Sequence, residues 1–267
     1  MTKIAIFCVC YNSYEILEKY LSSIDHSSKM AEGIAEVEVS VSDNTPKNAQ
    51  PIKYDAQNFQ LKVYAHNKNL GYFGGIGLMM QQENCHTYDY CIVSNVDVLM
   101  QPDTIKSIAL FSQPEKTGWI APIIFSEKEQ RDRNPQARQR YSRKRLSILR
   151  FMYKFSVLHY LYHRFVYKHR HNQTPTYGEV YAGHGSFIIL TKEYIKQCGI
   201  INYPIFLYGE EIYLAEQCRK NSLKVIHTPE IQVYDFDHYS TSGMKRKFYY
   251  QCHYEAIDYA IKNFFNK

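Results

Sequence analysis

The chain has 267 residues, 45% of them hydrophobic, which is enough for one large α/β domain or two small ones. No apolar run approaches the ~20 residues of a membrane span and no convincing signal peptide is present, so we expect a soluble or surface-bound protein. The seven cysteines include no CxxC pair, which favours a reduced, cytosolic protein over a disulfide-rich secreted one.

Strands and helices alternate along the first half of the chain. A near-continuous apolar strand is predicted over Lys3–Cys10, followed by a helix that Asn12 could cap together with Glu15. The next strands are expected over Val37–Ser42, Leu61–Ala65 and Tyr90–Ser94. A glycine-rich helix start separates the last two strands, and a short helix follows Pro102. This alternation predicts a doubly wound, mainly parallel α/β sheet with helices on both faces.

The second half is less regular. A strand over Trp119–Phe125 precedes a strongly basic segment, and a further strand then runs into a helix near residue 190. Another helix begins at Glu210, followed by a strand and a polar loop. The last element is an amphipathic helix over Met244–Phe265.

Polar side chains follow several of the predicted strands where each strand ends. Asn12 follows the first strand, Asp43 the second, and Asn95 and Asp97 the fourth. Asp and Asn are common turn residues for purely local reasons. In open α/β sheets, however, ligands bind beyond the carboxyl ends of the strands. Several polar strand ends at one end of the sheet therefore favour a ligand site.

The stretch "NLGYFGGIGL" places Gly71, Gly74, Gly75 and Gly77 between a strand and a helix. Its spacing is neither that of a dinucleotide-binding GxGxxG motif nor that of a P-loop. Glycines here could admit a phosphate group to the helix amino end, or could simply allow close helix packing. Both explanations stay open.

Acidic residues supply three further candidate sites, each with a simpler alternative. Asn95 and Asp97 could hold Mg²⁺ or Mn²⁺ whose other ligands come from substrate phosphates and water, or could form a turn. Glu210 and Glu211 could abstract a proton, or could simply favour a helix amino end. His238 follows two aspartates and could contact a metal or a phosphate.

Residues 127–172 hold 13 Lys or Arg against 3 Asp or Glu, whereas the rest of the chain is slightly acidic. We expect this segment to contact an anionic membrane through cations that include Arg140, Arg143, Lys144 and Arg145. The stripe expected to face the lipid consists of Leu146, Leu149, Tyr153, Val157 and Tyr160. A solvated basic face is the simpler alternative, and nucleic acid is the partner that we favour least.

The motifs occur in a recognisable order. The series "CYN", "SDN", "NLGYFGGIG", "SNVDV", "YAGHGSFIIL", "FLYGEEIYL" and "VYDFDHYSTS" resembles family-2 glycosyltransferases with the GT-A fold. The closest likeness is to the rhamnosyltransferase-like branch of bacterial surface-polysaccharide synthesis. The resemblance covers residues 3–125 and 178–243.

The resemblance implies a role for each motif. Asp43 would accept a hydrogen bond from the pyrimidine N3–H, and Asp97 would bind a divalent metal, Mn²⁺ or Mg²⁺, with help from His238. Glu211 would be the catalytic base beside Glu210. The implied nucleotide-sugar site consists of Tyr11, Asn12, Asp43, Asn44, Asn69, Gly71, Gly74, Gly75, Asn95 and Asp97.

The resemblance also implies an organisation and a reaction. A GT-A domain would cover residues 1–243, with a nucleotide-sugar half (1–125), a basic helical insertion (126–177) and an acceptor half (178–243), followed by the helix of 244–267. The enzyme would transfer a sugar, with inversion, from a UDP- or dTDP-sugar to a saccharide that is often lipid-linked. It would act on the inner face of the cytoplasmic membrane. It could form homo-oligomers.

Two other functions compete with this reading. A nucleotidyltransferase that makes sugar nucleotides would share the sheet and the metal, but normally has a basic, glycine-rich loop near its start, and "CVCYNSYE" provides neither glycine nor Lys. A non-catalytic module that binds a membrane or a nucleic acid would rest on the basic segment alone.

Overall fold

The structure is a computed structural model that describes residues 1–46, 50–155, 177–236 and 245–266. Its centre is a ten-stranded sheet with the order β3-β2-β1-β4-β9-β6-β10-β5, in which β7 also pairs with β6 and β8 with β10. The strands are β1 (Thr2–Cys10), β2 (Ala35–Asp43), β3 (Gln60–Ala65), β4 (Tyr90–Asn95), β5 (Val98–Met100), β6 (Thr117–Ser126), β7 (Arg131–Asp132), β8 (Gly178–Val180), β9 (Phe187–Thr191) and β10 (Lys224–Asp235). The helices are α1 (Tyr14–Met30), α2 (Tyr72–Gln82), the 3-10 helix η1 (Cys85–Thr87), α3 (Thr104–Leu110), α4 (Arg143–Lys154), α6 (Lys192–Cys198), α7 (Glu210–Lys220) and α8 (Arg246–Phe264).

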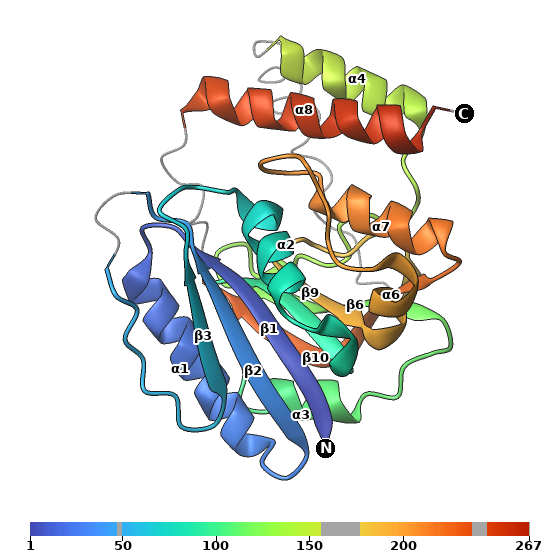
Figure 1. Cartoon of the computed structure of the whole chain (residues 1–267). Helices are drawn as coiled ribbons and strands as arrows, with labels where there is room; N and C mark the ends of the chain where they lie inside the picture. The colour runs from blue at the N-terminus through green and yellow to red at the C-terminus, as the bar shows by residue number, and fades with distance from the viewer. Residues whose placement is uncertain (47–49, 156–176, 237–244, 267) are drawn as a thin grey trace.

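Most of the long strands run in one direction. Parallel pairings join β3, β2, β1 and β4, and another joins β6 to β10. Because β9 lies antiparallel between β4 and β6, these two blocks point the same way. Their carboxyl ends therefore meet at one end of the sheet, toward the top of Figure 1. The predicted doubly wound, mainly parallel sheet is confirmed, with β5, β7, β8 and β9 as its antiparallel strands.

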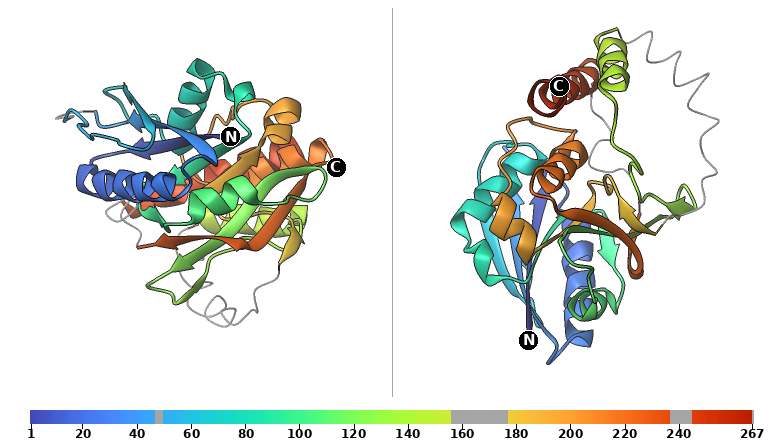
Figure 2. Two further views of the ribbon diagram at one scale, coloured as in Figure 1. Left: turned by 90° about the horizontal axis from the view of Figure 1, so that it is seen from below. Right: turned by 90° about the vertical axis from the view of Figure 1, so that its right-hand side faces the viewer.

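Both faces of the sheet are covered by helices, as Figure 2 shows. Alternate residues of β1 enter two separate apolar clusters, Ile4 and Ile6 on one face and Ala5 and Phe7 on the other. The first cluster contains α1 and α3, and the second contains α2, α6 and α7. A strand covered on both faces can be apolar at nearly every position, which explains the uninterrupted apolar run of β1.

The helix α1 starts differently from the prediction. Its N-cap residue is Ser13, whose side chain makes no capping hydrogen bond. Asn12 has a positive φ of 53° and its backbone N–H donates to Thr45 Oγ1 at 3.1 Å. The predicted cap by Asn12 and Glu15 is therefore wrong, because Asn12 lies in the turn between β1 and α1, where its backbone bonds to Thr45 beyond the end of β2.

The helices α4 and α8 form an additional layer beyond the carboxyl end of the sheet (Figure 1). Leu146 of α4 packs against Ile257, Ile261 and Phe265 at the far end of the chain, while Tyr153 lies 6.0 Å from the ring of Tyr250. The two helices therefore run antiparallel. Within the described residues, no helix is long and apolar enough to cross a bilayer.

The predicted lipid-facing stripe is wrong for the three of its residues that the structure describes. Leu146, Leu149 and Tyr153 all pack into the apolar cluster shared with α8. The remaining two, Val157 and Tyr160, lie outside the described residues. The 3.6-residue periodicity of these residues marks the side of α4 that packs on protein, not a lipid-facing side.

The basic segment is only partly helical and partly neutralised. Between residues 126 and 155, the described helix is α4 alone, and β7 precedes it. Arg133 forms a buried ion pair with Asp235, and Arg150 Nη1 lies 2.6 Å from Asp258 Oδ1. These arginines join parts of the chain that are distant in sequence. The net charge of the segment therefore overstates the positive charge available to bind a partner.

Glu216 of α7 is the centre of a buried polar cluster. Its carboxylate accepts hydrogen bonds from Arg140 Nε at 2.7 Å, Arg219 Nε at 2.9 Å and the Tyr181 hydroxyl at 2.8 Å. Arg140 Nη2 also donates to the carbonyl of Phe264, at the end of α8. Burial raises the pKa of Glu216, but these hydrogen bonds outweigh it and hold that pKa below its ordinary value. Arg140 is thus a structural residue, not the membrane contact that was predicted.

We expect Arg140→Met to lower the free energy of unfolding by about 2 kcal/mol, because hydrogen bonds to a charged group contribute about 1.5–3 kcal/mol. Urea denaturation at pH 7 measures the effect, and Arg143→Met, which alters an exposed residue at the start of α4, is the matched control. Because the pKa of Glu216 is lowered by folding, its ionised carboxylate stabilises the fold at pH values above the ordinary Glu pKa. This stabilisation is lost as pH falls through the pKa of Glu216 in the folded state. The difference between the wild type and Arg140→Met should therefore shrink at acid pH, and equal effects of the two substitutions would contradict the assignment.

Candidate active site

The candidate site lies at the carboxyl end of the sheet. Strands β1, β2 and β4 end there at Cys10, Asp43 and Asn95, and β1 aligns Cys10 with Asp43. β9 starts at the same place, because Phe187 is aligned with Ser94. The loop of residues 183–186, which leads into β9, therefore reaches the strand ends from the second half of the chain.

Asp43 is fixed in one orientation at the end of β2. Its buried carboxylate accepts hydrogen bonds from the Thr45 N–H and the Tyr14 hydroxyl, both at 3.0 Å. A carboxylate oxygen can accept a further bond, so Asp43 remains suited to a pyrimidine N3–H. Tyr11 and Asn12 are exposed at the same end of the sheet, and their place in a nucleotide pocket stays a prediction. The sequence analysis missed Tyr14, which orients the carboxylate.

Asn44 connects β2 to the glycine-rich turn. Its side chain accepts from Ser42 Oγ at 2.9 Å and donates to the carbonyl of Gly71 at 2.9 Å. Gly71 has a φ of 76° and lies so close to the carbonyl of Phe206 that a Cβ would sit 2.1 Å from the oxygen. Asn69 is exposed, and its Oδ1 accepts from the Gly71 N–H at 3.0 Å. Together these contacts fix the amino end of α2 beside the strand ends.

Close packing explains two of the remaining glycines. A Cβ at Gly75 would lie 2.7 Å from Ser42 Oγ, and one at Gly77 would lie 2.6 Å from the carbonyl of Ile201. At Gly74 the nearest such neighbour, Leu70 Cβ, would be at an ordinary 3.6 Å. The absence of side chains at 75 and 77 therefore seats α2 against its neighbours, while Gly74 leaves space at the helix start.

Asn95 and Asp97 lie at the end of β4, as predicted. The backbone N–H of Asn95 donates to the carbonyl of Ser186 at 2.8 Å, which joins β4 to the loop of 183–186. Asp97 is buried, and its carbonyl accepts from the Phe236 N–H at 3.3 Å. The neighbouring Asp235 is paired with Arg133. A buried carboxylate and a carboxamide thus lie two residues apart at the carboxyl end of β4.

The predicted metal site is only partly described. Among the residues that the structure describes, no group of three or more His, Cys, Asp or Glu side chains could hold a metal ion. The predicted ligand His238 lies outside those residues. Asp97 is therefore the described side chain to which the prediction still applies.

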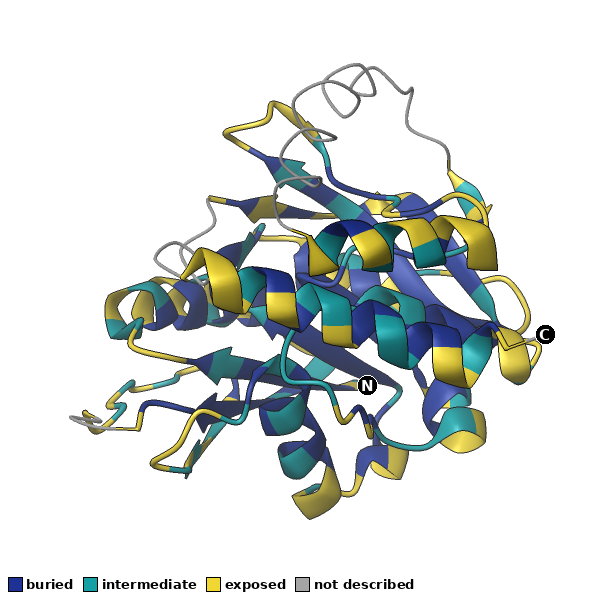
Figure 3. Cartoon of the chain, turned by 90° about the horizontal axis from the view of Figure 1, so that it is seen from above, coloured by how far each residue is buried: buried dark blue, intermediate teal, exposed yellow. Residues whose placement is uncertain are grey.

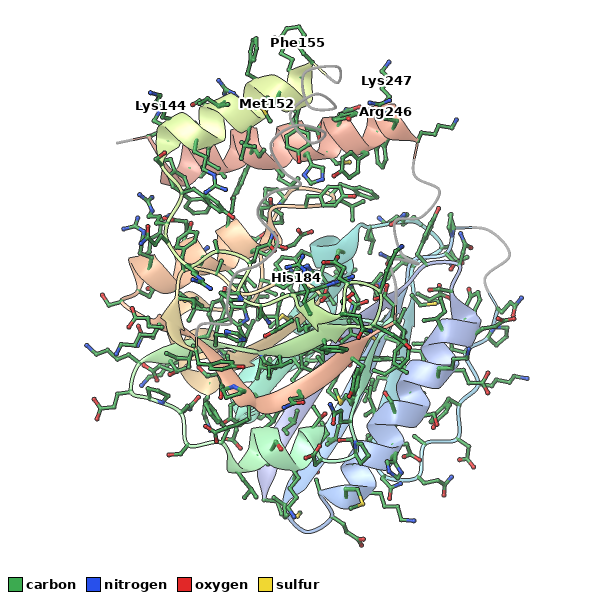
Figure 4. The ribbon with its side chains drawn as sticks, turned by 180° about the vertical axis from the view of Figure 1, so that it is seen from behind. Lys144, Met152, Phe155, His184, Arg246 and Lys247 are labelled. Carbon is green, nitrogen blue, oxygen red and sulfur yellow. The ribbon has the colours of Figure 1, made fainter. Side chains whose placement is uncertain are left out.

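The loop of residues 183–186 connects the two halves of the site. The Gly185 N–H donates to Glu211 Oε1 at 3.3 Å, and the carbonyl of Gly185 accepts from the Tyr72 hydroxyl at 3.1 Å. A Cβ at Gly185 would lie 3.0 Å from Glu211 Oε1, so the glycine lets the acid approach closely. The N–H of His184 donates to Asn134 Oδ1 at 2.7 Å. His184 lies between the sheet and the α4–α8 layer (Figure 4).

Glu210 and Glu211 begin α7 and face different surroundings. Glu210 is buried, whereas Glu211 is half-buried and touches the loop of 183–186. Burial, followed by the charge of Glu211, raises the pKa of Glu210. Burial likewise raises the pKa of Glu211, although backbone N–H groups that include Gly185 act against the change. The more accessible acid of the pair is Glu211, the one predicted to be the base.

Tyr72 relates the two acidic parts of the site. Burial raises the pKa of its hydroxyl well above the ordinary value, and the charges of Glu210 and Asp97 raise it further. One phenol therefore lies within electrostatic reach of both the predicted metal ligand and the acid pair. The sequence analysis assigned no role to Tyr72, although it stands inside the glycine-rich motif.

An aromatic stack connects the acid pair to the α4–α8 layer. The ring of His253 in α8 lies 3.7 Å from that of Tyr208 and 4.6 Å from that of Tyr153 in α4, nearly parallel to both. Tyr208 and Gly209 both have positive φ, and the carbonyl of Tyr208 accepts from the Tyr203 hydroxyl at 2.9 Å. The turn that presents Glu210 and Glu211 is thus held from the side of the added layer.

The comparisons with known proteins agree with this geometry. Residues 5–189 match the family model described as glycosyl transferase family 2. A search of curated proteins finds no match. Two structures of residues 1–349 of S. aureus TarS are similar in fold, with TM-scores of 0.58 (16% identity) and 0.59 (14% identity, in complex with UDP-GlcNAc). GalNAc-T7 with UDP, GalNAc and Mn²⁺ gives a TM-score of 0.63 at 12% identity.

Each of these matches covers 98% of the chain, but only 66%, 67% and 48% of the respective structures. The chain thus spans about half to two thirds of their length. At these identities the structures establish the fold alone, and they confirm the GT-A class expected from the motifs. Because the family model covers more than half of the chain, the chain belongs to glycosyl transferase family 2.

Proposed function

We propose that the protein transfers a sugar, with inversion, from a UDP- or dTDP-sugar to a hydroxyl of a saccharide acceptor. The observation that carries this proposal is the contact of Gly185 with Glu211, because the same loop is bonded to Asn95. The loop of residues 183–186 thereby holds the accessible acid Glu211 near the end of β4. Asp43, at the end of β2, supplies the recognition of a pyrimidine base that such a donor needs.

The donor class rests on Asp43 and on the similar structures. The fixed carboxylate of Asp43 suits the N3–H that uracil and thymine share, and so does not distinguish UDP from dTDP. TarS in complex with UDP-GlcNAc shows a nucleotide sugar bound to this fold. We extend the proposal to a hexosyl or deoxyhexosyl transfer in bacterial capsule, O-antigen or other surface-polysaccharide synthesis, with a lipid-linked saccharide as acceptor and the rhamnosyltransferase-like branch as the subgroup.

A divalent metal fits the donor set at the end of β4. The buried Asp97 carboxylate and the Asn95 carboxamide are oxygen donors, and Mg²⁺ or Mn²⁺ needs only one or two protein carboxylates when substrate phosphates and water complete its shell. Asp97 would hold the metal, with His238 as the further predicted ligand. A bound metal would neutralise negative charge on the departing diphosphate.

Glu211 would act on the acceptor. As the acceptor oxygen forms its bond to the anomeric carbon, Glu211 takes the hydroxyl proton and the bond to the diphosphate oxygen breaks with its electron pair. The raised pKa of Glu211 brings the carboxylate nearer to the operating pH, where a general base is most effective. Attack from the face opposite the diphosphate inverts the anomeric carbon. Glu210 is fully enclosed, and burial and the charge of Glu211 raise its own pKa.

The reaction class can be tested by incubating the protein with UDP- and dTDP-sugars, with and without Mn²⁺. Metal-dependent release of the nucleoside diphosphate is expected. Formation of pyrophosphate instead would identify a nucleotidyltransferase, and the absence of both products and of donor-induced thermal stabilisation would contradict an enzyme of either class.

We expect Asp97→Asn to lower turnover at least about 100-fold, which corresponds to about 2.7 kcal/mol of transition-state stabilisation. The Mn²⁺-dependent part of donor binding, measured by calorimetry, should disappear, because a neutral amide holds the cation less strongly. Asp103→Asn, at an exposed position before α3, is the matched control. A folded Asp97→Asn protein with unchanged Mn²⁺-dependent donor affinity would exclude the metal role.

We expect Glu211→Gln to reduce kcat by about 10²–10⁴-fold while the donor Kd stays unchanged, because a base acts on the acceptor. Glu210→Gln is the matched comparison and should retain more activity. In the wild type, kcat should fall as pH drops through the raised pKa of the pair, since the base must be ionised. An inactive Glu210→Gln beside an active Glu211→Gln would reverse the assignment.

A further inference from the structure

The outer side of α4 carries a second set of apolar residues. Ile148, Phe151 and Phe155 are 51%, 56% and 47% exposed, and the rings of the two phenylalanines lie 4.9 Å apart. The spacing of three residues places Ile148 and Phe151 on one side of the helix. Phe155 is the C-cap residue, just after the helix, and its ring lies beside that of Phe151. These three residues are called the outer face of α4 below.

Packing among the residues that the structure describes does not account for the outer face. The core-directed residues of α4 are Leu146 and Met152, which are buried, and Leu146 packs into the cluster with α8. Seen from above, α4 and α8 lie side by side with exposed positions along both (Figure 3). A helix on the surface of a protein normally has one apolar side, so the second side of α4 indicates a partner.

The charged residues of α4 are all basic, and the acid beside them on α8, Asp258, is paired with Arg150. The sequence of α4 contains no acidic residue, and Lys144 and Lys154 are exposed near its two ends. The amino end of α8 lies beside the carboxyl end of α4, and Lys245 and Lys247 are exposed there (Figure 4). Phe248, although 42% exposed, packs its ring on that of Phe206, 5.8 Å away, and so is not part of the outer face. Exposed cations thus surround an exposed aromatic patch.

We propose that the outer face of α4 and the neighbouring cations bind an anionic lipid bilayer. Phenylalanine and isoleucine would enter the boundary between headgroups and acyl chains, while the lysines would lie at the lipid phosphates. A nucleic acid could contact the cations, but it offers no aliphatic surface against which Ile148 could pack. The predicted membrane contact is therefore kept, but moved to the opposite side of α4.

The position of the layer suits such a role. α4 and α8 lie beyond the carboxyl end of the sheet, where the candidate site is (Figure 1). The aromatic stack through Tyr153, His253 and Tyr208 joins the layer to the turn before Glu210. Lipid binding by α4 does not require the proposed transfer reaction, so the two can fail separately.

The test is cosedimentation of the whole protein with vesicles of phosphatidylcholine, with or without 30% phosphatidylglycerol. Two triple variants divide the contributions: Lys144→Ser, Lys154→Ser and Lys247→Ser remove charge, and Ile148→Ser, Phe151→Ser and Phe155→Ser remove apolar contact. All six positions are exposed, so both variants should fold. The controls are Lys19→Ser, Lys29→Ser and Lys106→Ser for charge and Met30→Ser, Val63→Ser and Leu110→Ser for apolar contact, all at exposed positions.

The wild type should prefer the anionic vesicles. Each surface cation strengthens such binding by about fivefold, so the charge variant should lose at least about tenfold at low salt. The apolar variant should lose the binding that persists when salt is raised, since apolar contact is not screened. Both control triples should bind like the wild type, and all four variants should keep donor hydrolysis.

Several results would overturn the inference. These are equal wild-type binding to neutral and anionic vesicles, α4 variants that bind as well as the controls, and competition of an oligonucleotide for the same cations without vesicle binding. A wild-type dimer that the apolar variant dissociates, without any loss of vesicle binding, would assign the face to a second copy of the chain.

Discussion

Burial of two neighbouring carboxylates, Glu210 and Glu211, places the strongest demand on the surrounding structure. Enclosure disfavours their charged forms, so the pKa of each is raised, and a raised carboxyl pKa costs stability as pH rises above the ordinary value. The turn before them has a positive φ at Tyr208 and at Gly209, and the glycine at 185 lets Glu211 approach the loop of 183–186 closely. Much of the second half of the chain is therefore arranged around keeping one of these acids accessible.

The first half of the fold and its polar strand ends were predictable from the sequence because they follow from short-range rules. Apolar runs such as that of β1 indicate buried parallel strands, and parallel strands must end together. This reasoning placed Asp43, Asn95 and Asp97 at one end of the sheet. It could not find Tyr14 or Tyr72, because each acts through a hydroxyl that meets a partner 29 and 113 residues away in the chain.

The basic segment shows where composition misleads. A count of charges treats Arg133, Arg140 and Arg143 alike, yet the first is paired with Asp235 at the end of β10, the second holds the buried Glu216, and the third is exposed. The helical period of α4 was visible in the sequence, but two apolar sides satisfy it. Only the placement of α8 distinguishes the side that packs on protein from the one that faces outward.

The layer of α4 and α8 also sets a minimum distance between the candidate site and any surface that α4 contacts. A helix with its side chains is about 10–12 Å across, so a surface resting on the outer face of α4 would stand at least that far from Glu211. An acceptor anchored in that surface could present its reactive hydroxyl only if the hydroxyl were carried a comparable distance from the anchor. The added layer would then select acceptors by the distance between their membrane anchor and their reactive hydroxyl, as well as by their terminal sugar.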